Sequence, residues 1–273
     1  MPELPEVETI ARGLRGSLIG RTIAQVTLHR RSIFRGNPRE LEPLLGATFV
    51  AVQRAGKYLV FELRKRNARW QLMVHLGMTG RLIVEDQGDA VLKHTHLMLD
   101  LDDGRALRFS DPRRFGKVAL APAPEFGFAA QLGVAQGAEP LEVSASEFAR
   151  LFGRRAAPIK NALLNQRLLR GVGNIYADES LHRTGLAPHA TQVSRPRLER
   201  LRLALRAVLE EAIAAGGSSI SDYVGSDGAP GLFHLEHRVY GREGEPCPRC
   251  RGRIRRIVLA GRSAHYCPRC QRA

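Results

Sequence analysis

Apolar positions near the N-terminus follow a helical period. They recur at spacings of three and four residues, which predicts a helix over 5–18. The residues that set this period are Val7, Ile10, Leu14 and Leu18. The next hundred residues do not continue this period, so the helix is expected to stand at the edge of a different kind of structure.

Residues 20–120 consist of short segments rich in Val, Leu, Ile and Phe, separated by Gly, Asp or charged residues. Many short strands at close spacing are typical of a sandwich or a barrel. The run Asp102-Asp103-Gly104 predicts a hairpin turn between two of the strands. The expected strands are 22–28, 47–53, 58–63, 70–76, 81–84, 95–101, 105–109 and 116–120.

From about residue 144 the apolar pattern is helical again. The clearest stripe covers 195–215 and ends at Gly216-Gly217. Before it, residues 121–140 are rich in Ala, Gly and Pro with few charges, which indicates a linker or hinge. After it, residues 217–234 are rich in Ser, Gly and Asp and are expected to form an exposed loop. The chain is therefore predicted to pass from a strand-rich to a helical part.

Composition limits the class of protein. The chain of 273 residues is long enough for one large or two medium domains, and 44% hydrophobic with 25% charged residues is ordinary for a globular protein. There is no run of about 18 apolar residues, so no transmembrane helix is expected. Glu3, Glu6 and Glu8 at the N-terminus do not fit a secretory signal, which favours a cytoplasmic protein.

A strong positive charge indicates a polyanionic partner. The formal net charge is +15, which favours nucleic acid or an anionic membrane surface. The last 40 residues, 234–273, carry 10 basic and 3 acidic side chains, nearly half of the excess. Lysine is rare, and where it occurs its particular chemistry is a weak indication of function. The lysines are Lys57, Lys65, Lys93, Lys117 and Lys160.

All the cysteines lie in two C-x-x-C pairs, Cys247–Cys250 and Cys267–Cys270, with 16 residues between the pairs. This spacing is typical of a zinc site, because each tight turn directs two thiolates at one point and four thiolates complete a tetrahedral shell. With no open position the zinc would be structural. Two disulfides or a redox dithiol are the alternatives, but nothing in the sequence indicates an oxidising compartment.

Between the cysteine pairs the pattern predicts a hairpin. Ile254–Leu259 and Ala264–Tyr266 are the expected strands, with Ala260–Ser263 at the tip and several arginines around it. A metal-stapled hairpin with Arg262 at its tip is suited to enter a groove and contact phosphates. The alternative is a solvated basic face.

The chain begins Met1-Pro2-Glu3-Leu4-Pro5-Glu6. The initiator Met is expected to be removed before proline, which exposes a secondary amine whose reference pKa of about 8 makes it a better nucleophile than lysine at neutral pH. Such an amine can attack a sugar C1′ and form an iminium, with Glu3 as general acid or base. The alternative is that these residues only begin a helix.

Several motifs together resemble the bacterial formamidopyrimidine-DNA glycosylases. The chain carries them in the order of that family from residue 2 to residue 270, and six in order are highly specific. They are the N-terminal Pro-Glu-Leu-Pro-Glu run, His75–Gly80, Asp111–Gly116, Gly171–Glu179, Val239–Cys247 and the paired C-x-x-C end.

The resemblance implies an α+β fold. An N-terminal β-sandwich catalytic domain with flanking helices (1–130) is followed by an interdomain hinge (131–143), a helical domain with a helix–two-turn–helix (144–234) and a β-hairpin zinc finger (235–273). Loop 217–234 would close over the flipped base, and DNA would lie in the cleft between the domains. At the hinge the family's Leu-Gly-Pro-Glu-Pro-Leu reads Gln136-Gly137-Ala138-Glu139-Pro140-Leu141, which puts hinge stiffness in doubt.

The resemblance also implies a reaction, in which oxidised purines such as 8-oxoguanine and formamidopyrimidines are excised from double-stranded DNA in base excision repair. The strand is then cleaved by β- and δ-elimination. Pro2 would be the nucleophile and Glu3 the acid/base, with Glu6 supporting the site and Lys57 near the damaged nucleotide. The protein is expected to act as a monomer in the bacterial cytoplasm, at the nucleoid, with one structural Zn²⁺ and no membrane partner.

Further positions match the DNA contacts of the family. A flipped base leaves a hole in the stack that side chains fill. Met78, Arg113 and Phe115 match the filling residues, although Met78 and Phe115 read alone resemble core positions. The remaining matches are phosphate or backbone contacts: Asn174, Arg262, His75, Lys160 and Tyr240. From its sequence context alone, Asn174 would be a helix N-cap.

Two other functions stay open at this point. An endonuclease VIII-type glycosylase for oxidised pyrimidines shares the Pro-Glu start, the helix motif and the zinc finger, although Leu4 and the Asp111–Gly116 run favour the purine enzyme. A zinc-dependent DNA-binding protein without catalysis is the second.

Overall fold

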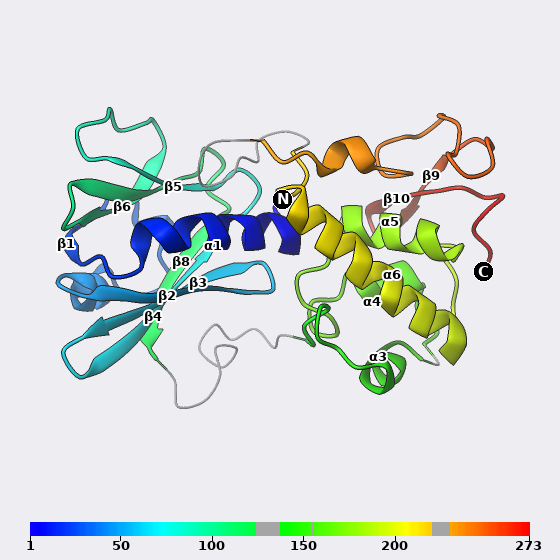
Figure 1. The fold of residues 1–273 in the computed structure, drawn as a ribbon, viewed down its shortest axis with the longest axis horizontal. Coiled ribbons are helices and arrows are strands. Elements are labelled where there is room, and N and C mark those ends of the chain that lie inside the picture. The colour runs from blue at the N-terminus through cyan, green and yellow to red at the C-terminus, as the bar shows by residue number, and fades with distance from the viewer. Residues whose placement is uncertain (124–136, 154, 220–229) are drawn as a thin grey trace. The chain divides into compact units, whose positions relative to one another are not determined.

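The chain forms two compact units (Figure 1). The computed structural model describes residues 1–123, 137–153, 155–219 and 230–273. Unit 1 comprises Met1–Val134 and Gly216–Gly231, and unit 2 comprises Ala135–Ala215 and Leu232–Ala273. The segment Gly216–Gly231, which the sequence analysis placed in the helical domain, groups with unit 1.

Unit 1 contains a β-sandwich, as predicted. Over the described residues its strands form two four-stranded antiparallel sheets, ordered β1-β6-β7-β5 and β2-β3-β4-β8. Each strand overlaps a segment expected from the apolar pattern, and the turn at Asp102–Gly104 joins β6 to β7. The strands are β1 Ile23–Leu28, β2 Thr48–Ala55, β3 Tyr58–Lys65, β4 Ala68–His75, β5 Arg81–Asp86, β6 Thr95–Leu101, β7 Arg105–Ser110 and β8 Lys117–Pro122.

Helix α1, Leu4–Leu18, packs against both sheets. It contacts β2 and β3 of one sheet and β5 of the other, and Figure 1 shows it running along them. The four residues that predicted the helix are at most 2% exposed and join the main hydrophobic core. Short 3-10 helices Arg31–Ile33 and Pro38–Leu44 complete this unit. Because α1 is fixed along its whole apolar face, its N-terminus is held at a defined place on unit 1.

Unit 2 is helical and carries the predicted hairpin. The long helix α6 buries every residue of its predicted stripe. The elements are α3 Ala145–Phe152, α4 Ile159–Leu163, α5 Asn174–Thr184, α6 Arg195–Ala214, a 3-10 helix Phe233–Glu236, β9 Arg255–Leu259 and β10 Arg262–Tyr266. No described helix is long and apolar enough to cross a membrane.

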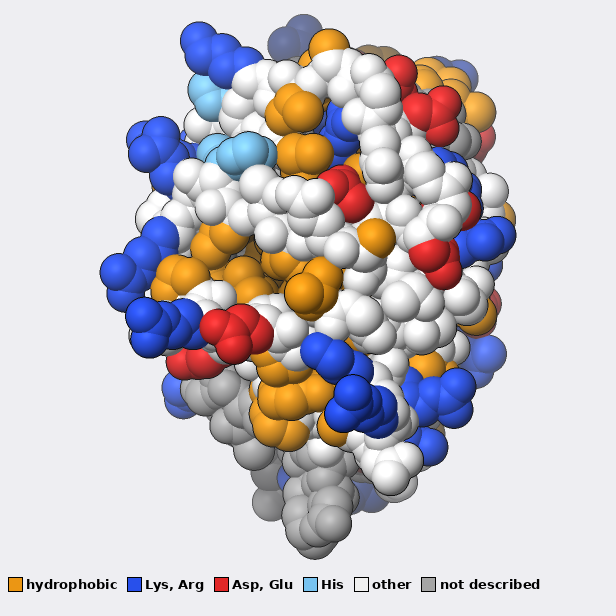
Figure 2. Space-filling model, turned by 90° about the vertical axis from the view of Figure 1, so that its left-hand side faces the viewer, with side chains coloured by type: hydrophobic (Ala, Val, Ile, Leu, Met, Phe, Trp, Pro, Cys, Tyr) orange, Lys and Arg blue, Asp and Glu red, His pale blue; other side chains and the backbone are white. Residues whose placement is uncertain are grey.

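Basic side chains are prominent on the surface. Figure 2 shows one face of the molecule, on which Lys and Arg side chains surround apolar ones and acidic side chains form smaller groups. This distribution agrees with the formal net charge of +15.

Two local expectations were wrong. The hairpin turn is only Ala260-Gly261, and Arg262 pairs with Leu259 as the first residue of β10. The region 217–234 is not exposed throughout, because Ser218 and Phe233 are buried at its two ends. The hinge stays a prediction; at its described end, Ala138 donates its N–H to Leu168 O at 3.0 Å. Residues 131–136 of that hinge and 220–229 of that loop lie outside the described residues.

Lys160 is a further correction, because a buried ion pair takes the place of the expected DNA contact. Its side chain is 1% exposed and that of Asp178 is 0% exposed, with 2.6 Å between Nζ and Oδ1. Lys160 Nζ also donates to Ser263 O at 2.5 Å, and Asp178 Oδ2 accepts from His265 N at 2.8 Å. The pair therefore fastens β10 to α4 and α5, and the ammonium is not available to a phosphate.

Removing one charge of this pair should destabilise the protein. Lys160→Met keeps the side-chain length and leaves the Asp178 carboxylate buried without its counter-charge, so we expect the free energy of unfolding in urea to fall by about 3 kcal/mol. Arg206→Met is the control, since Arg206 and Glu210 form an exposed pair with side chains 50% and 52% exposed. Its cost should stay below about 1 kcal/mol. Equal, small losses in both variants would contradict this role.

Candidate active site and zinc centre

The N-terminal residues are held by one buried carboxylate. Glu6, in the first turn of α1, is 2% exposed. Its Oε2 accepts from Glu3 N at 2.7 Å, and its Oε1 accepts from Ser218 N at 2.8 Å. Pro2 is buried beside this bridge, and Glu3, the residue before α1, is 4% exposed. The structure therefore brings Pro2, Glu3 and Glu6 together in one low-exposure site.

Gly217 is required for the approach of Ser218 to Glu6. Its φ of +84° is a left-handed conformation, and a Cβ at this position would lie 3.0 Å from Glu6 Cγ. A side chain here would therefore strain the backbone and push the carboxylate away. The Gly216-Gly217 pair, which the sequence analysis used only as a helix end, also shapes the site.

Lys57 and His75 both belong to the sheet formed by β2, β3, β4 and β8. Lys57 is in the turn between β2 and β3 and is 7% exposed, whereas His75 ends β4, with its ring 4.9 Å from that of Tyr58. Burial, together with the nearby positive charges of Lys57 and Arg35, lowers the pKa of His75 to about 4. Its Nδ1 accepts from Gly77 N at 3.1 Å. The ring is therefore neutral at pH 7, with its proton on Nε2 as a donor.

Met78, Arg113 and Phe115 are presented by two loops that touch. Met78 is 41% and Phe115 53% exposed, so neither is a core residue, and the Arg113 guanidinium lies 4.9 Å from the centre of the Phe115 ring. Gly77 permits the contact between the loops: its φ is +66° and a Cβ there would lie 2.5 Å from Gly116 N. The predicted filling residues thus lie on adjoining loops.

Asp111 holds these two loops together, a role that the sequence analysis missed. This carboxylate is fully buried. Its Oδ1 accepts from Thr79 Oγ1 at 2.5 Å and its Oδ2 from Gly116 N at 2.7 Å. An Asp after a strand reads as a turn residue in sequence, so only the fold shows which loop it reaches.

In unit 2, Asn174 and Arg262 are both next to Ser263. Asn174 Nδ2 donates to Ser263 Oγ at 3.2 Å, and Arg262 is exposed on β10. Asn174 is the first residue of α5 and Gly173 is the N-cap, so the expectation of an Asn174 N-cap was wrong. Its amide is directed at the hairpin instead.

Tyr240 belongs to a turn organised by Glu179, another residue that sequence reasoning missed. Glu179 is fully buried on α5, and its carboxylate accepts from the backbone N–H groups of Arg238, Val239 and Tyr240 at 2.9–3.0 Å. Burial raises the pKa of Glu179, an effect that these hydrogen bonds oppose. The Tyr240 ring lies 5.2 Å from that of His265 in β10. The turn is therefore packed against the hairpin.

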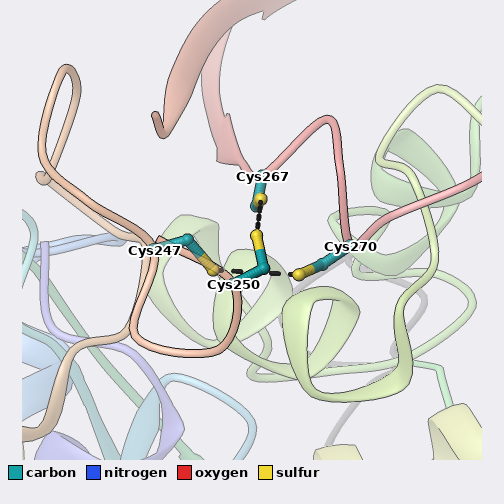
Figure 3. A group of neighbouring side chains, drawn as sticks. All are labelled: Cys247, Cys250, Cys267 and Cys270. Atoms are coloured by element: carbon teal, nitrogen blue, oxygen red, sulfur yellow. Dashed lines mark hydrogen bonds between the residues drawn. The ribbon is translucent and has the colours of Figure 1, made fainter. Parts of the chain in front are cut away.

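The four cysteines converge on one point (Figure 3). All four Sγ atoms lie within 4.8 Å of one another, with Cys247–Cys270 at 3.9 Å and Cys250–Cys267 at 3.5 Å. Disulfide sulfurs would be about 2 Å apart, whereas Zn–S bonds of about 2.3 Å place tetrahedral sulfurs about 3.8 Å apart. The cysteines are free and fit one structural zinc ion. The zinc prediction is confirmed and the disulfide alternative is excluded.

Family models match three parts of the chain. The formamidopyrimidine-DNA glycosylase N-terminal domain matches residues 1–118, the formamidopyrimidine-DNA glycosylase H2TH domain matches 136–224, and a zinc finger found in FPG and IleRS matches 244–273.

Relatives match over the full length. A formamidopyrimidine-DNA glycosylase of Solibacter usitatus is 46% identical, with 100% of each chain covered, and one of Paracoccus denitrificans is 45% identical over 99% of this chain and 100% of the relative.

Solved structures agree. The crystal structure of MutM (Fpg) from Thermus thermophilus is 42% identical with a TM-score of 0.87, covering 99% of this chain and 98% of that one. A complex between Lactococcus lactis Fpg and DNA containing an abasic site is 32% identical with a TM-score of 0.91, covering 99% and 100%. A further complex of that protein with DNA containing Fapy-dG has a TM-score of 0.90, 32% identity and the same coverage. With its zinc centre and its two-sheet sandwich, the chain belongs to the formamidopyrimidine-DNA glycosylase family.

Proposed function

We propose that this protein is a bifunctional DNA glycosylase and abasic-site lyase of base excision repair that acts on oxidised purines. The observation that carries the proposal is the Glu6 bridge, which holds Pro2 and Glu3 in a buried site. The Lactococcus lactis relative has been crystallised with DNA containing Fapy-dG and with DNA containing an abasic site, which supports both a formamidopyrimidine substrate and an abasic intermediate. We infer that the protein works on duplex DNA in the bacterial cytoplasm.

The proposed chemistry starts at the Pro2 nitrogen, once Met1 has been removed. This secondary amine attacks C1′ of the damaged nucleoside, the bond from C1′ to the base breaks, and the base leaves with a proton. Glu3 supplies or accepts protons as the sugar ring opens to the iminium. Loss of the C2′ proton then expels the 3′ phosphate, and loss of the C4′ proton expels the 5′ phosphate. Water finally releases the enzyme from the sugar fragment.

Glu6 acts in this scheme as a positioning residue. Both of its oxygens accept backbone N–H groups, one from Glu3 and one from Ser218, so the carboxylate orients the N-terminal backbone. Lys57 is placed in the same unit, where its ammonium would neutralise a phosphate next to the damaged nucleotide. The neutral His75 would contact a phosphate through its Nε2–H, a donor that does not require protonation at pH 7.

Met78, Arg113 and Phe115 are proposed to occupy the space left by the flipped base. Their exposure and the contact between their two loops support this role, because a filling group must project from the surface yet keep a fixed direction. The Arg113 guanidinium carries N–H groups that can donate hydrogen bonds to acceptor atoms of a cytosine. In unit 2, Asn174, Arg262 and Tyr240 are proposed to contact the DNA backbone, and the zinc ion stabilises the hairpin that presents Arg262.

Borohydride trapping tests the nucleophile. On a duplex with 8-oxoguanine opposite cytosine, the mature protein should form a reducible covalent adduct. Pro2→Gly should trap at least about 10-fold less because the secondary amine is lost, and Glu3→Gln should lower the excision rate by about 100-fold. Glu210→Gln is the control, since Glu210 lies on α6 and forms an exposed pair with Arg206.

Full lyase activity in Pro2→Gly would contradict the proposed nucleophile. A strong preference for thymine glycol over 8-oxoguanine would instead indicate a pyrimidine-specific enzyme. Mass spectrometry of the purified protein reports whether Met1 is absent.

Asp111→Asn should impair the loops that carry the filling residues without directly changing the groups that carry out the chemistry. Loss of the charge weakens the bonds to Thr79 and Gly116, so we expect single-turnover excision of 8-oxoguanine to slow by about 10-fold or more. Cleavage of a preformed abasic site should change less, since no base must be held out. Asp103→Asn, at the opposite end of β7, is the matched control and should leave both rates unchanged. Equal losses on the two substrates would argue against this role of Asp111.

Zinc removal should affect DNA binding before the chemistry. Stripping the metal with a chelator, or making Cys267→Ser, frees the hairpin that carries Arg262, and duplex affinity should fall by about 10-fold or more. Trapping at saturating protein should be largely retained, and re-addition of zinc after chelation should restore the affinity. Unchanged affinity of the metal-free protein would contradict the proposed role of the hairpin.

A further inference from the structure

A buried histidine outside the cysteine motifs is directed at the zinc centre. His182 lies on α5, eight residues beyond Asn174, and is 1% exposed. Its Nε2 is 3.4 Å from Sγ of Cys247, which is itself fully buried. This contact joins residues 65 positions apart, so neither C-x-x-C spacing nor helical periodicity indicates it.

Zinc ligation decides which atom carries the proton in this contact. A cysteine bound to zinc is a thiolate and has no S–H to donate, so Nε2 must be the donor. The environment of the other ring nitrogen supports this assignment of the proton. Nδ1 of His182 is buried and has no hydrogen-bond partner among the described residues. A buried acceptor without a partner is less costly than a buried N–H without one. The tautomer with its proton on Nε2 therefore places a donor next to the Cys247 sulfur and leaves no buried N–H without a partner at Nδ1.

The other sulfurs with hydrogen bonds receive them from the backbone. Cys250 is approached by the N–H of Gly252, and Cys267 by the N–H groups of Arg269 and Cys270. Across the part of the chain that the structure describes, His182 supplies the one side-chain hydrogen bond that reaches a cysteine sulfur from outside the four cysteines. Cys247 thus accepts its hydrogen bond from a side chain on a helix, whereas Cys250 and Cys267 accept theirs from backbone N–H groups of the neighbouring turns.

We propose that His182 is an outer hydrogen-bond donor to the zinc-bound thiolate of Cys247, and that this bond retards zinc loss. A centre of four thiolates and one Zn²⁺ has an excess negative charge of two, and a donor to sulfur disperses part of it. Groups that hold metal ligands in this way often change metal affinity by about 10- to 100-fold. The bond also connects the Cys247 sulfur to the helix whose first residue is Asn174.

Two substitutions separate the hydrogen bond from packing. His182→Phe fills the space of the imidazole without an N–H, whereas His182→Gln retains an N–H donor. His189→Phe is the control, since His189 is an exposed histidine of the same unit whose ring lies 6.0 Å from that of Tyr266. Zinc content and thermal unfolding of each full-length variant establish that it is folded and loaded.

The first measurement is the rate of zinc transfer to a chromophoric chelator in excess. We expect His182→Phe to release zinc about 10-fold faster than the unchanged protein, and His182→Gln to release it at close to the unchanged rate. His189→Phe should behave as the unchanged protein.

The second measurement uses protein in which Co²⁺ replaces zinc. Loss of a hydrogen bond to sulfur raises the energy of the sulfur lone pairs, so the sulfur-to-cobalt charge-transfer band should move to longer wavelength in His182→Phe only. Unchanged release and an unchanged band in His182→Phe would overturn the proposal. Equal acceleration in the Phe and Gln variants would also overturn it, because packing alone would then explain the effect.

Discussion

Buried carboxylates that accept backbone N–H groups hold the segments on which the proposed chemistry depends. Glu6 binds the N–H groups of Glu3 and Ser218, Asp111 that of Gly116, Asp178 that of His265, and Glu179 those of three successive residues. Burying a charge is unfavourable unless it is fully hydrogen-bonded, so each carboxylate permits few arrangements of its loop. In this strongly basic protein, the buried acidic groups fix the positions of the loops at the site, and the exposed arginines attract an anionic partner.

The sandwich and the helices could be predicted from the sequence because their signals are local. Each strand is a short apolar segment bounded by a turn, and the α6 stripe repeats every three or four residues, so burial of one face decides the element. The zinc ligands were predictable for the same reason, since C-x-x-C spacing brings two sulfurs together within one turn. Pro2 and Glu3 could be singled out by chemistry at the N-terminus, although the family resemblance was needed to prefer catalysis over a helix start.

Some errors are local, such as the length of the hairpin turn, but those that change the interpretation of the site concern contacts between distant residues. Lys160 was expected to face DNA, but its backbone-carbonyl partner is Ser263, 103 positions away. Thr79 and Asp111 are 32 positions apart, and Glu6 and Ser218 are 212 apart. A polar residue has the same appearance in sequence whether it is solvated or buried with a partner, because hydrophobic periodicity records burial only for apolar side chains. Polar contacts of this kind become visible only when the fold places both partners.

The hydrogen bond between Ser218 and Glu6 also determines whether the N-terminal part of the chain contains a complete site by itself. Ser218 belongs to Gly216–Gly231, a short segment that groups with unit 1 although the residues before and after it belong to unit 2. Unit 1 is therefore discontinuous in sequence, and a fragment ending at Val134 would lack the N–H group that orients the N-terminal carboxylate. Gene fusion or recombination at the obvious boundary between strands and helices would separate two halves of one site. The two units are interleaved along the chain, so no single cut releases one of them without dividing the other.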